Sequence, residues 1–126
     1  MIYPRYEPTP PIAGDLKLVS RPIVVTAGQN AAFTVLPRIT LLGIVTATNK
    51  CVICKATATD GSQVPAYVTT DDLDTSAADV PANGYVEGEF AWELANVDPS
   101  WTLQTLNAAL AARPSLLIFV QIGATA

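Results

Sequence analysis

Clustered aspartates are the first candidates for chemistry in this sequence. The stretch TTDDLDTSAAD, residues 69–79, carries Asp71, Asp72, Asp74 and Asp79. A calcium loop of the EF-hand type that began at Asp72 would need glycine at its sixth position and a bidentate glutamate at its twelfth. Those positions hold Ala77 and Asn83. We therefore predict no metal site, but a solvated connection between two strands in which Asp, Thr and Ser side chains bond to their own backbone.

A second group of carboxylates, Glu87 and Glu89, lies in the segment YVEGEFAWEL. Residues two apart on a strand share a face, and such a pair could serve as the acid and base of a glycosidase. The same spacing is found on solvent-facing strand edges, where charges discourage pairing with other sheets. Catalysis would also need a cleft with aromatic walls, for which Trp92 and Trp101 are the candidates. We expect no enzyme activity from this pair.

Cys51 and Cys54 form the sequence CVIC. In a thioredoxin-like fold this motif would open a helix and act in redox chemistry. Here the pair lies in β-branched sequence, and residues three apart on a strand point to opposite faces. A disulfide would need a distorted strand, and a zinc site would need two more ligands. We expect two buried free thiols.

Histidine is absent from the sequence. Its absence removes the commonest general base and metal ligand, together with every Ser-His or Cys-His nucleophilic arrangement. The sequence also lacks the glycine-rich nucleotide loops and the HExxH and GxSxG motifs. We therefore expect neither catalysis nor a cofactor.

The composition limits the partners of the chain. Its 126 residues, enough for one domain, are 50% hydrophobic and 14% charged, which is apolar for a small soluble protein. We expect another chain to cover part of its surface. The apolar runs fall short of the roughly 20 residues that cross a bilayer, which argues against a membrane. Seven Lys and Arg, scattered singly in a chain of net charge −4, give no basic patch for direct nucleic-acid binding.

The N-terminal sequence MIYPRYEPTPPIAG carries four prolines and no helical period. Proline fixes φ and removes the amide donor, so we expect residues 1–15 to form an extended arm and residues 16–126 a single β-rich domain. The arm is either a frayed terminus or a docking segment anchored by Ile2, Tyr3, Tyr6 and Ile12. It lacks the regions of a secretory signal, so we expect synthesis in a cytoplasm.

Short apolar runs between turn signals predict a mainly β domain. We expect strands in LKLV and PIVVT, in FTVLPRITLLGIVTAT with Pro37 at an edge or kink, and on both sides of a tight turn at Asp60-Gly61. A second turn is predicted at Asn83-Gly84. The segment that follows alternates, with Tyr85, Glu87, Glu89 and Ala91 on one face and Val86, Gly88, Phe90 and Trp92 on the other.

One helix, at about residues 100–112, is predicted in DPSWTLQTLNAALAARP. Asp98 or Ser100 would accept its first free amides, and its apolar stripe consists of Leu103, Leu106 and Leu110. A final strand is predicted in SLLIFVQIG. Because this strand is apolar on both faces, it should be buried in the domain or at a subunit contact.

Four segments occur in an order that resembles one known family. They are ATDGS at 58–62, LDTSAAD at 73–79, GYVEGEFAWE at 84–93 and LNAALAARPSLLIFV at 106–120. Their order and spacing are similar to those of the lambda-type bacteriophage head decoration, or capsid-stabilising, proteins. The resemblance extends over about residues 14–122.

This resemblance implies a small β-clip-like domain that assembles as a homotrimer, with no catalysis and no cofactor. Such trimers would sit at the three-fold and quasi-three-fold positions of the expanded head, on the outer surface of the virion. The N-terminal arms would contact the major capsid protein and help the shell to resist the pressure of packaged DNA. The alternative function is a tail or fibre accessory subunit, or a small β-type glycan-binding module.

Overall fold

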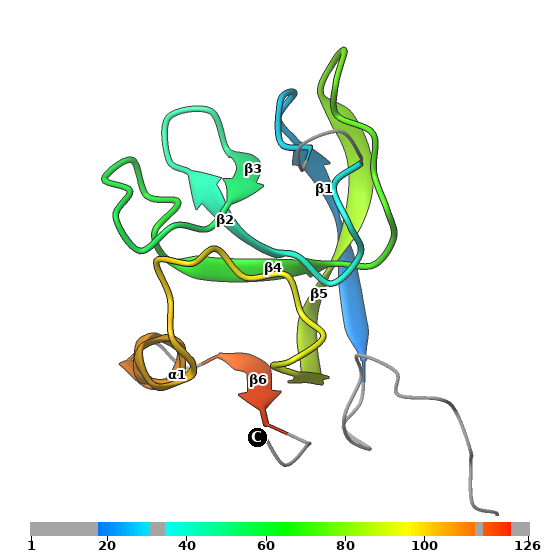
Figure 1. Ribbon diagram of the computed structural model, residues 1–126. Coiled ribbons are helices and arrows are strands. Elements are labelled where there is room, and N and C mark those ends of the chain that lie inside the picture. Colours follow the sequence, from blue (N-terminus) through cyan, green and yellow to red (C-terminus); the bar gives the residue numbers. More distant parts are fainter. Residues whose placement is uncertain (1–17, 31–34, 113–114, 122–126) are drawn as a thin grey trace, which may run out of the picture.

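The computed structural model describes residues 18–30, 35–112 and 115–121, and Figure 1 shows the arrangement of their elements. In chain order these elements are β1 (Val19–Val25), β2 (Leu41–Val45), β3 (Lys50–Ile53), β4 (Pro65–Thr69), β5 (Val80–Ala91), α1 (Leu103–Ala112) and β6 (Leu116–Val120). The prediction of a mainly β domain with one helix near the C-terminus is confirmed. In the described ranges no helix is long and apolar enough to cross a membrane. The predicted arm lies outside these ranges.

β5 connects the two ends of the sheet, because other strands pair with both of its edges. Along one edge it is antiparallel to β1, from Val80 to Glu87. Along the other edge it pairs first with β4, at Gly84 and Tyr85, and then with β6, which runs parallel to it. β3 and β2 connect β1 to β4. The strands β1, β3, β2, β4 and β5 therefore form a closed ring, and β6 extends the sheet beyond it (Figure 1).

Two hydrophobic clusters stabilise the domain. The first joins α1 to the sheet and contains Ile39, Leu41, Cys54, Val68, Phe90, Leu106, Leu110, Leu117 and Phe119, with Leu103 packed against it. This packing confirms the predicted apolar stripe of the helix. The second cluster contains Ile23, Val25, Leu36, Leu42 and Cys51. Burying a side chain of the size of leucine or phenylalanine contributes about 1.5–3 kcal/mol, so these clusters provide much of the driving force for folding.

Cys51 and Cys54 are buried free thiols, as the sequence predicts. Cys51 belongs to the second cluster and Cys54 to the first, so the two side chains do point to opposite faces. Burial raises the pKa of Cys51 to about 11 and the pKa of Cys54 to about 12. Because the thiolate is the reactive form, both side chains serve packing and not nucleophilic chemistry.

α1 begins later than predicted, and the cap predicted at Asp98 or Ser100 is wrong. Thr102 Oγ1 accepts the N–H of Thr105 at 3.1 Å, and Thr105 Oγ1 accepts the N–H of Thr102 at 2.9 Å. This reciprocal pair is a capping box with threonine in place of the usual glutamate. Asp98 and Ser100 stabilise the preceding loop instead, since Ser100 donates its N–H to Asp98 at 3.0 Å and Ser100 Oγ accepts the N–H of Ala56 at 2.9 Å.

The turn predicted at Asn83-Gly84 is wrong, because β5 runs through both residues. Gly84 pairs with β1 on one side and with β4 on the other. A Cβ at this position would lie 2.8 Å from Tyr67 Cβ and 3.0 Å from Ile23 Cδ1. Glycine is therefore required by the close approach of neighbouring side chains and not by a tight turn.

The tight hairpin predicted at Asp60-Gly61 is also wrong. β3 and β4, on its two sides, do not pair with each other, because β2 lies between them. The hairpin is formed by β2 and β3, around a turn at residues 46–49 in which Asn49 has a φ of 57°. Gly61 does have a positive φ of 103°. The Asp-Gly pair therefore predicted the backbone conformation of Gly61 correctly, but it did not predict which strands pair.

The apolar segment FTVLPRITLLGIVTAT contributes one short strand, β2, among its described residues. Pro37 lies at a kink, as predicted, since Leu36 forms an isolated bridge with Leu73 and Ile39 has a positive φ of 59°. A β-branched residue in this conformation costs about 1–3 kcal/mol. Burial of the Ile39 side chain and a hydrogen bond of 2.9 Å from its N–H to Thr69 O offset this cost.

The alternation predicted for β5 holds at one end of the strand and fails at the other. Gly88 and Phe90 are buried on one face, as predicted. The same pattern places Tyr85 on the opposite face, yet the ring centroids of Tyr85 and Phe90 are 5.6 Å apart. The register with β1 shifts between Tyr85 and Glu87, so β5 has one extra residue there. This bulge reverses the alternation and brings Tyr85 to the core face.

The strand predicted in SLLIFVQIG is present as β6, and it is buried on one face only. Leu117 and Phe119 are buried in the first cluster. Leu116 and Ile118 are 60% and 39% exposed. Packing within the domain thus accounts for one apolar face of β6 and leaves the other face exposed in a single chain.

Gly84→Ala should destabilise the domain, because the new Cβ would overlap the side chains of Tyr67 and Ile23. Overpacking of this kind costs about 1–3 kcal/mol in free energy of unfolding. The exposed neighbour provides the control, since Asn83→Ala should change the free energy by less than about 0.5 kcal/mol. Urea unfolding followed by circular dichroism measures both. Equal stability of the two variants would contradict a close approach at Gly84.

Candidate functional site

The predicted docking residues Ile2, Tyr3, Tyr6 and Ile12 lie outside the described residues. The first described residue, Leu18, is 40% exposed. Its side chain lies against Gly88, where an added Cβ would be 2.7 Å from Leu18 Cδ2. Leu18 therefore lies beside the part of β5 that pairs with β6.

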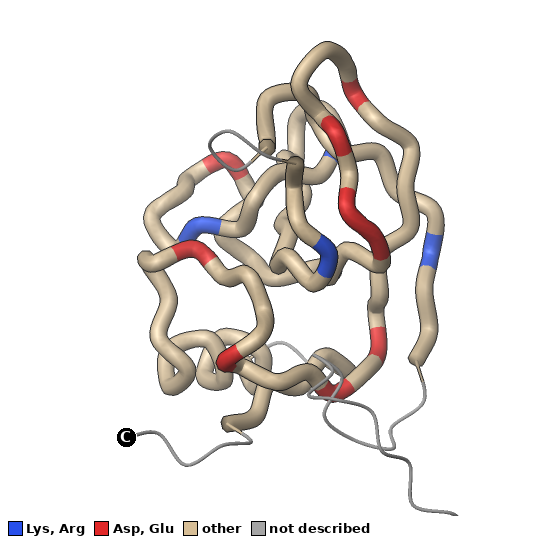
Figure 2. The backbone as a smooth tube through the Cα atoms, turned by 45° about the vertical axis from the view of Figure 1, so that its right-hand side comes forward, with Lys and Arg blue, Asp and Glu red and all other residues tan. Residues whose placement is uncertain are grey.

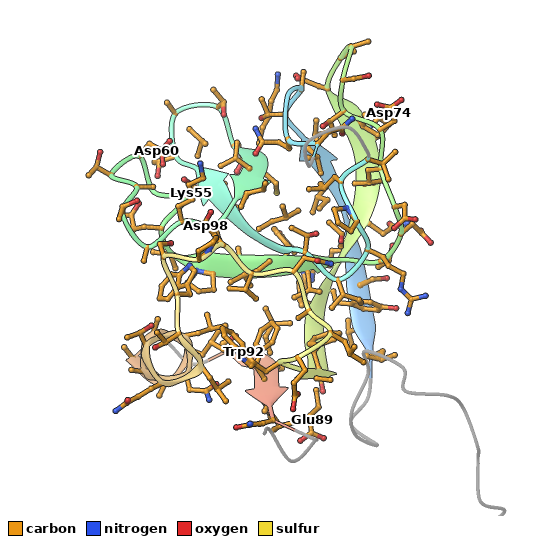
Figure 3. All side chains as sticks on the ribbon, in the orientation of Figure 1. Lys55, Asp60, Asp74, Glu89, Trp92 and Asp98 are labelled. Atoms are coloured by element: carbon orange, nitrogen blue, oxygen red, sulfur yellow. The ribbon has the colours of Figure 1, made fainter. Side chains whose placement is uncertain are left out.

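The outer face of β5 and β6 places carboxylates beside exposed apolar side chains. The register pairs Glu87 with Leu116 and Glu89 with Ile118. Figure 3 shows Glu89 at the lower end of the molecule, beside β6. We call the surface formed by Glu87, Glu89 and Ile118 the β5–β6 rim. No described residue forms an ion pair with either glutamate.

The two tryptophans do not form an aromatic cleft over these glutamates. Trp92 and Trp101 are half-buried and pack against the first hydrophobic cluster. The indole N–H of Trp101 donates to Cys54 O at 3.1 Å. The two tryptophans therefore do not supply the aromatic walls that the glycosidase interpretation would need.

A concave surface, which we call the Tyr67 groove, is bordered by Leu116. It consists of a hollow of about 670 Å³ and a second of about 350 Å³, which share Ile44, Asn49 and Tyr67. The larger hollow extends to Arg21, Val86 and Leu116, and the smaller one to Pro22, Val24 and Pro81. Arg21 is the one charged side chain among the described lining residues. The groove thus combines apolar and polar side chains with a single cation.

The acidic stretch is the loop from β4 to β5, and its carboxylates bind neighbouring loops. Asp72 Oδ1 accepts the N–H of Arg38 at 2.7 Å. Asp79 accepts the N–H of Ala27 at 2.9 Å and an N–H of Lys50 Nζ at 2.6 Å. Among the described residues no group of three or more His, Cys, Asp or Glu could hold a metal ion. These aspartates therefore fix backbone segments to one another.

Thr75 lies at the centre of this loop and is fully buried. Its Oγ1 accepts the N–H of Gln29 at 2.9 Å and donates to Asn30 Oδ1 at 2.8 Å. Asn30 Nδ2 donates in turn to Asp74 Oδ1 at 3.0 Å. The predicted bonding within the loop is also present, since Ser76 donates its N–H to the same Asp74 oxygen at 3.0 Å. The loop is thus held both by itself and by the segment after β1.

These hydrogen bonds keep two surface carboxylates ionised. Hydrogen bonds from Asn30 and Ser76 lower the pKa of Asp74 below its ordinary value of 3.8. Lys50, followed by the Ala27 N–H, lowers the pKa of Asp79 in the same way. A general acid or base that works near neutral pH needs a pKa close to 7. Both shifts move away from that range, so the acidic loop has a structural role.

The Tyr67 groove is the feature that sequence reasoning missed. Its lining comes from all six strands, from α1 and from the loops between them. Apolar residues such as Ile44 and Val86 fit strand patterns equally well when they are buried and when they line a surface hollow. The available signal was compositional, namely too few charges to cover a small domain.

A family model described as bacteriophage lambda head decoration protein D matches residues 10–118 of the chain. The matched range contains β1 to β5, α1 and most of β6. No curated protein matches the chain. The matching family is the one that the order of the four sequence segments resembles.

Thr75→Val should destabilise the domain by about 1–3 kcal/mol, because an isosteric apolar side chain leaves the partners of a buried hydroxyl unpaired. Those partners are the Gln29 N–H and Asn30 Oδ1. The adjacent exposed hydroxyl serves as the control, and Ser76→Ala should cost less than about 0.5 kcal/mol. Urea unfolding at pH 7 compares the two. A cost for Thr75→Val as small as that of the control would refute the anchoring role.

Acid should destabilise the domain partly through Asp74 and Asp79. Their folded-state pKa values lie below 3.8, so the unfolded state binds protons first as the pH falls. This stabilisation is complete above the unfolded pKa and is lost as the pH falls through the folded pKa, so unfolding measurements should cover about pH 5 to pH 3. The double variant Asp74→Asn with Asp79→Asn should lose less stability over this range than the unaltered chain. The same loss in both would show that these shifts do not govern acid stability.

Proposed function

Because the chain belongs to the family of bacteriophage lambda head decoration protein D, we propose that it binds as a trimer to the three-fold and quasi-three-fold positions of the expanded phage head. There it acts as a structural cement that stabilises the shell against the pressure of packaged DNA. The observation that carries this proposal is the match of the family over residues 10–118. Family membership supports a capsid decoration role in place of catalysis.

The major capsid protein is the proposed partner, and residues 1–15 are the proposed contact. Four prolines in this segment lower the entropy lost when an extended arm becomes ordered on a partner. Three arms on one rigid trimer bind with an increased effective concentration, so each arm needs only modest affinity. Ile2, Tyr3, Tyr6 and Ile12 are the anchors we propose within the arm.

The outer surface of the virion is the proposed location, after synthesis in the host cytoplasm. The distribution of charge supports a protein contact in place of direct contact with DNA. Figure 2 shows several acidic positions down the right-hand side of the molecule and others on the left, whereas the basic positions are separated from one another. The described cations are Arg21, Arg38, Lys50 and Lys55, and they follow no common strand. Nucleic-acid binding needs a basic patch or stripe, which these positions do not form.

The head is favoured over the other structural roles that the sequence allows. A tail or fibre accessory subunit and a glycan-binding module would both be compatible with a small β domain. The matching family is a head decoration family, and its match extends over most of the chain.

Replacing Tyr3, Tyr6 and Ile12 together by serine should reduce occupancy on expanded heads, because it removes the apolar anchors of the arm. Cosedimentation of the full-length chain with heads measures occupancy. A matched control in the same arm replaces Glu7 by glutamine and Thr9 by alanine, and its occupancy should equal that of the unaltered chain. The loss of an anchor at an interface costs about 2 kcal/mol or more, so the anchor variant should need at least tenfold more protein for half occupancy.

A chain that lacks residues 1–13 provides the second test of the arm. Unfolding curves of the free proteins establish that the domain itself is unchanged. Equal occupancy of the truncated, the anchor-substituted and the unaltered chains on expanded heads would refute docking through the arm.

A further inference from the structure

We propose that the Tyr67 groove is a contact between subunits, and that a second copy of this chain covers it with its β5–β6 rim. The inference rests on the proposed trimer and adds which two surfaces meet. It assigns Arg21 of one subunit to Glu87 and Glu89 of the next.

The lining of the groove includes the residue types that are enriched at the centres of subunit interfaces. Ile44, Val64, Tyr67 and Val86 provide apolar or aromatic walls, and Arg21 is the one charged side chain among the described lining residues. Interfaces between subunits that stay associated are more apolar than transient ones, and their centres are depleted in charge and enriched in Tyr and Arg.

Opposite charges without partners lie on the two surfaces. Among the described residues the salt bridge joins Lys50 to Asp79, and Arg21 takes part in none. Glu87 and Glu89 on the rim also lack an ionic partner there, although both side chains are half-buried. When the rim of one subunit covers the groove of the next, a glutamate meets the arginine in a contact with little water. Such a contact strengthens the ion pair and fixes the register of the two subunits.

The two surfaces are adjacent, and this arrangement suits a small closed ring. Leu116 lines the groove and is also paired beside Glu87 on the rim. In a three-fold ring each subunit uses two different surfaces, one for each neighbour, and these two surfaces meet near the axis. Leu116 is 60% exposed, more than any other large hydrophobic side chain among the described residues. Its position at the boundary of the two surfaces places it nearest the axis, where three copies bury one another.

Val24→Asp tests the groove, and Leu94→Asp is its matched control. The two side chains are 39% and 38% exposed, and Val24 lines the groove whereas Leu94 does not. Light scattering coupled to size exclusion gives the mass of the full-length chain. A charge buried in an apolar contact prevents association, so Val24→Asp should reduce the mass about threefold, from trimer to monomer. Leu94→Asp should remain trimeric.

Charge exchange tests which surfaces meet. Arg21→Glu alone, and Glu87→Arg with Glu89→Arg, should each raise the concentration needed for trimer formation by about tenfold or more. The chain that carries all three substitutions should recover association. The charged ends of these side chains make no bonds to described residues, so circular dichroism and unfolding midpoints should match those of the unaltered chain.

The outcomes separate this inference from the proposed function. Trimers that persist in both Val24→Asp and Arg21→Glu, and that still bind expanded heads, would overturn the subunit contact and leave head decoration intact. Persistent trimers that no longer bind heads would assign the groove to the capsid and would also overturn the inference. An unaltered chain that stays monomeric at every concentration would also overturn the subunit contact. Failure of the unaltered chain to bind heads would instead contradict the proposed function, whatever its oligomeric state.

Discussion

Pairing along both edges of β5 is the constraint on which the rest of the structure depends. The first half of this strand closes the ring through β1 and β4, and the second half holds β6. α1 then packs against β6 and β5 in the first hydrophobic cluster. Gly84 permits this arrangement because a side chain there would overlap Tyr67 and Ile23. One strand therefore contributes to both the groove and the rim, the two surfaces that the proposed trimer would bring together.

The features that the sequence predicted correctly depend on local chemistry. The leucine stripe of α1 and the opposite orientation of Cys51 and Cys54 follow from the helix and strand periods alone. The two wrong turns, at Asp60-Gly61 and Asn83-Gly84, depend on which distant strand lies alongside. An Asp-Gly or Asn-Gly pair fits a tight turn, but its glycine fits equally well a strand whose neighbours need the space of a Cβ. Periodicity was also insufficient where a bulge reverses the alternation of β5 and brings Tyr85 to Phe90.

In the candidate site too, the sequence indicated the local features and did not indicate those that depend on distant strands. The carboxylates of the acidic loop attracted attention by their density, yet Asp72, Asp74 and Asp79 accept hydrogen bonds that hold neighbouring loops. Their low pKa values are a consequence of that role. The surfaces proposed to carry function combine apolar side chains with a few charges and are assembled from several strands. No single segment could reveal them, and the surplus of hydrophobic residues over charges was the only trace in the sequence.

We propose that this chain decorates phage heads as a trimer at three-fold positions. Cryo-electron microscopy of expanded heads of the cognate phage, incubated with saturating protein, tests it most directly. We expect added density at the three-fold and quasi-three-fold positions, into which three copies of the ring formed by β1 to β5 can be placed around each axis. Shells that remain bare at these positions, with the protein left in solution, would refute head decoration by this chain.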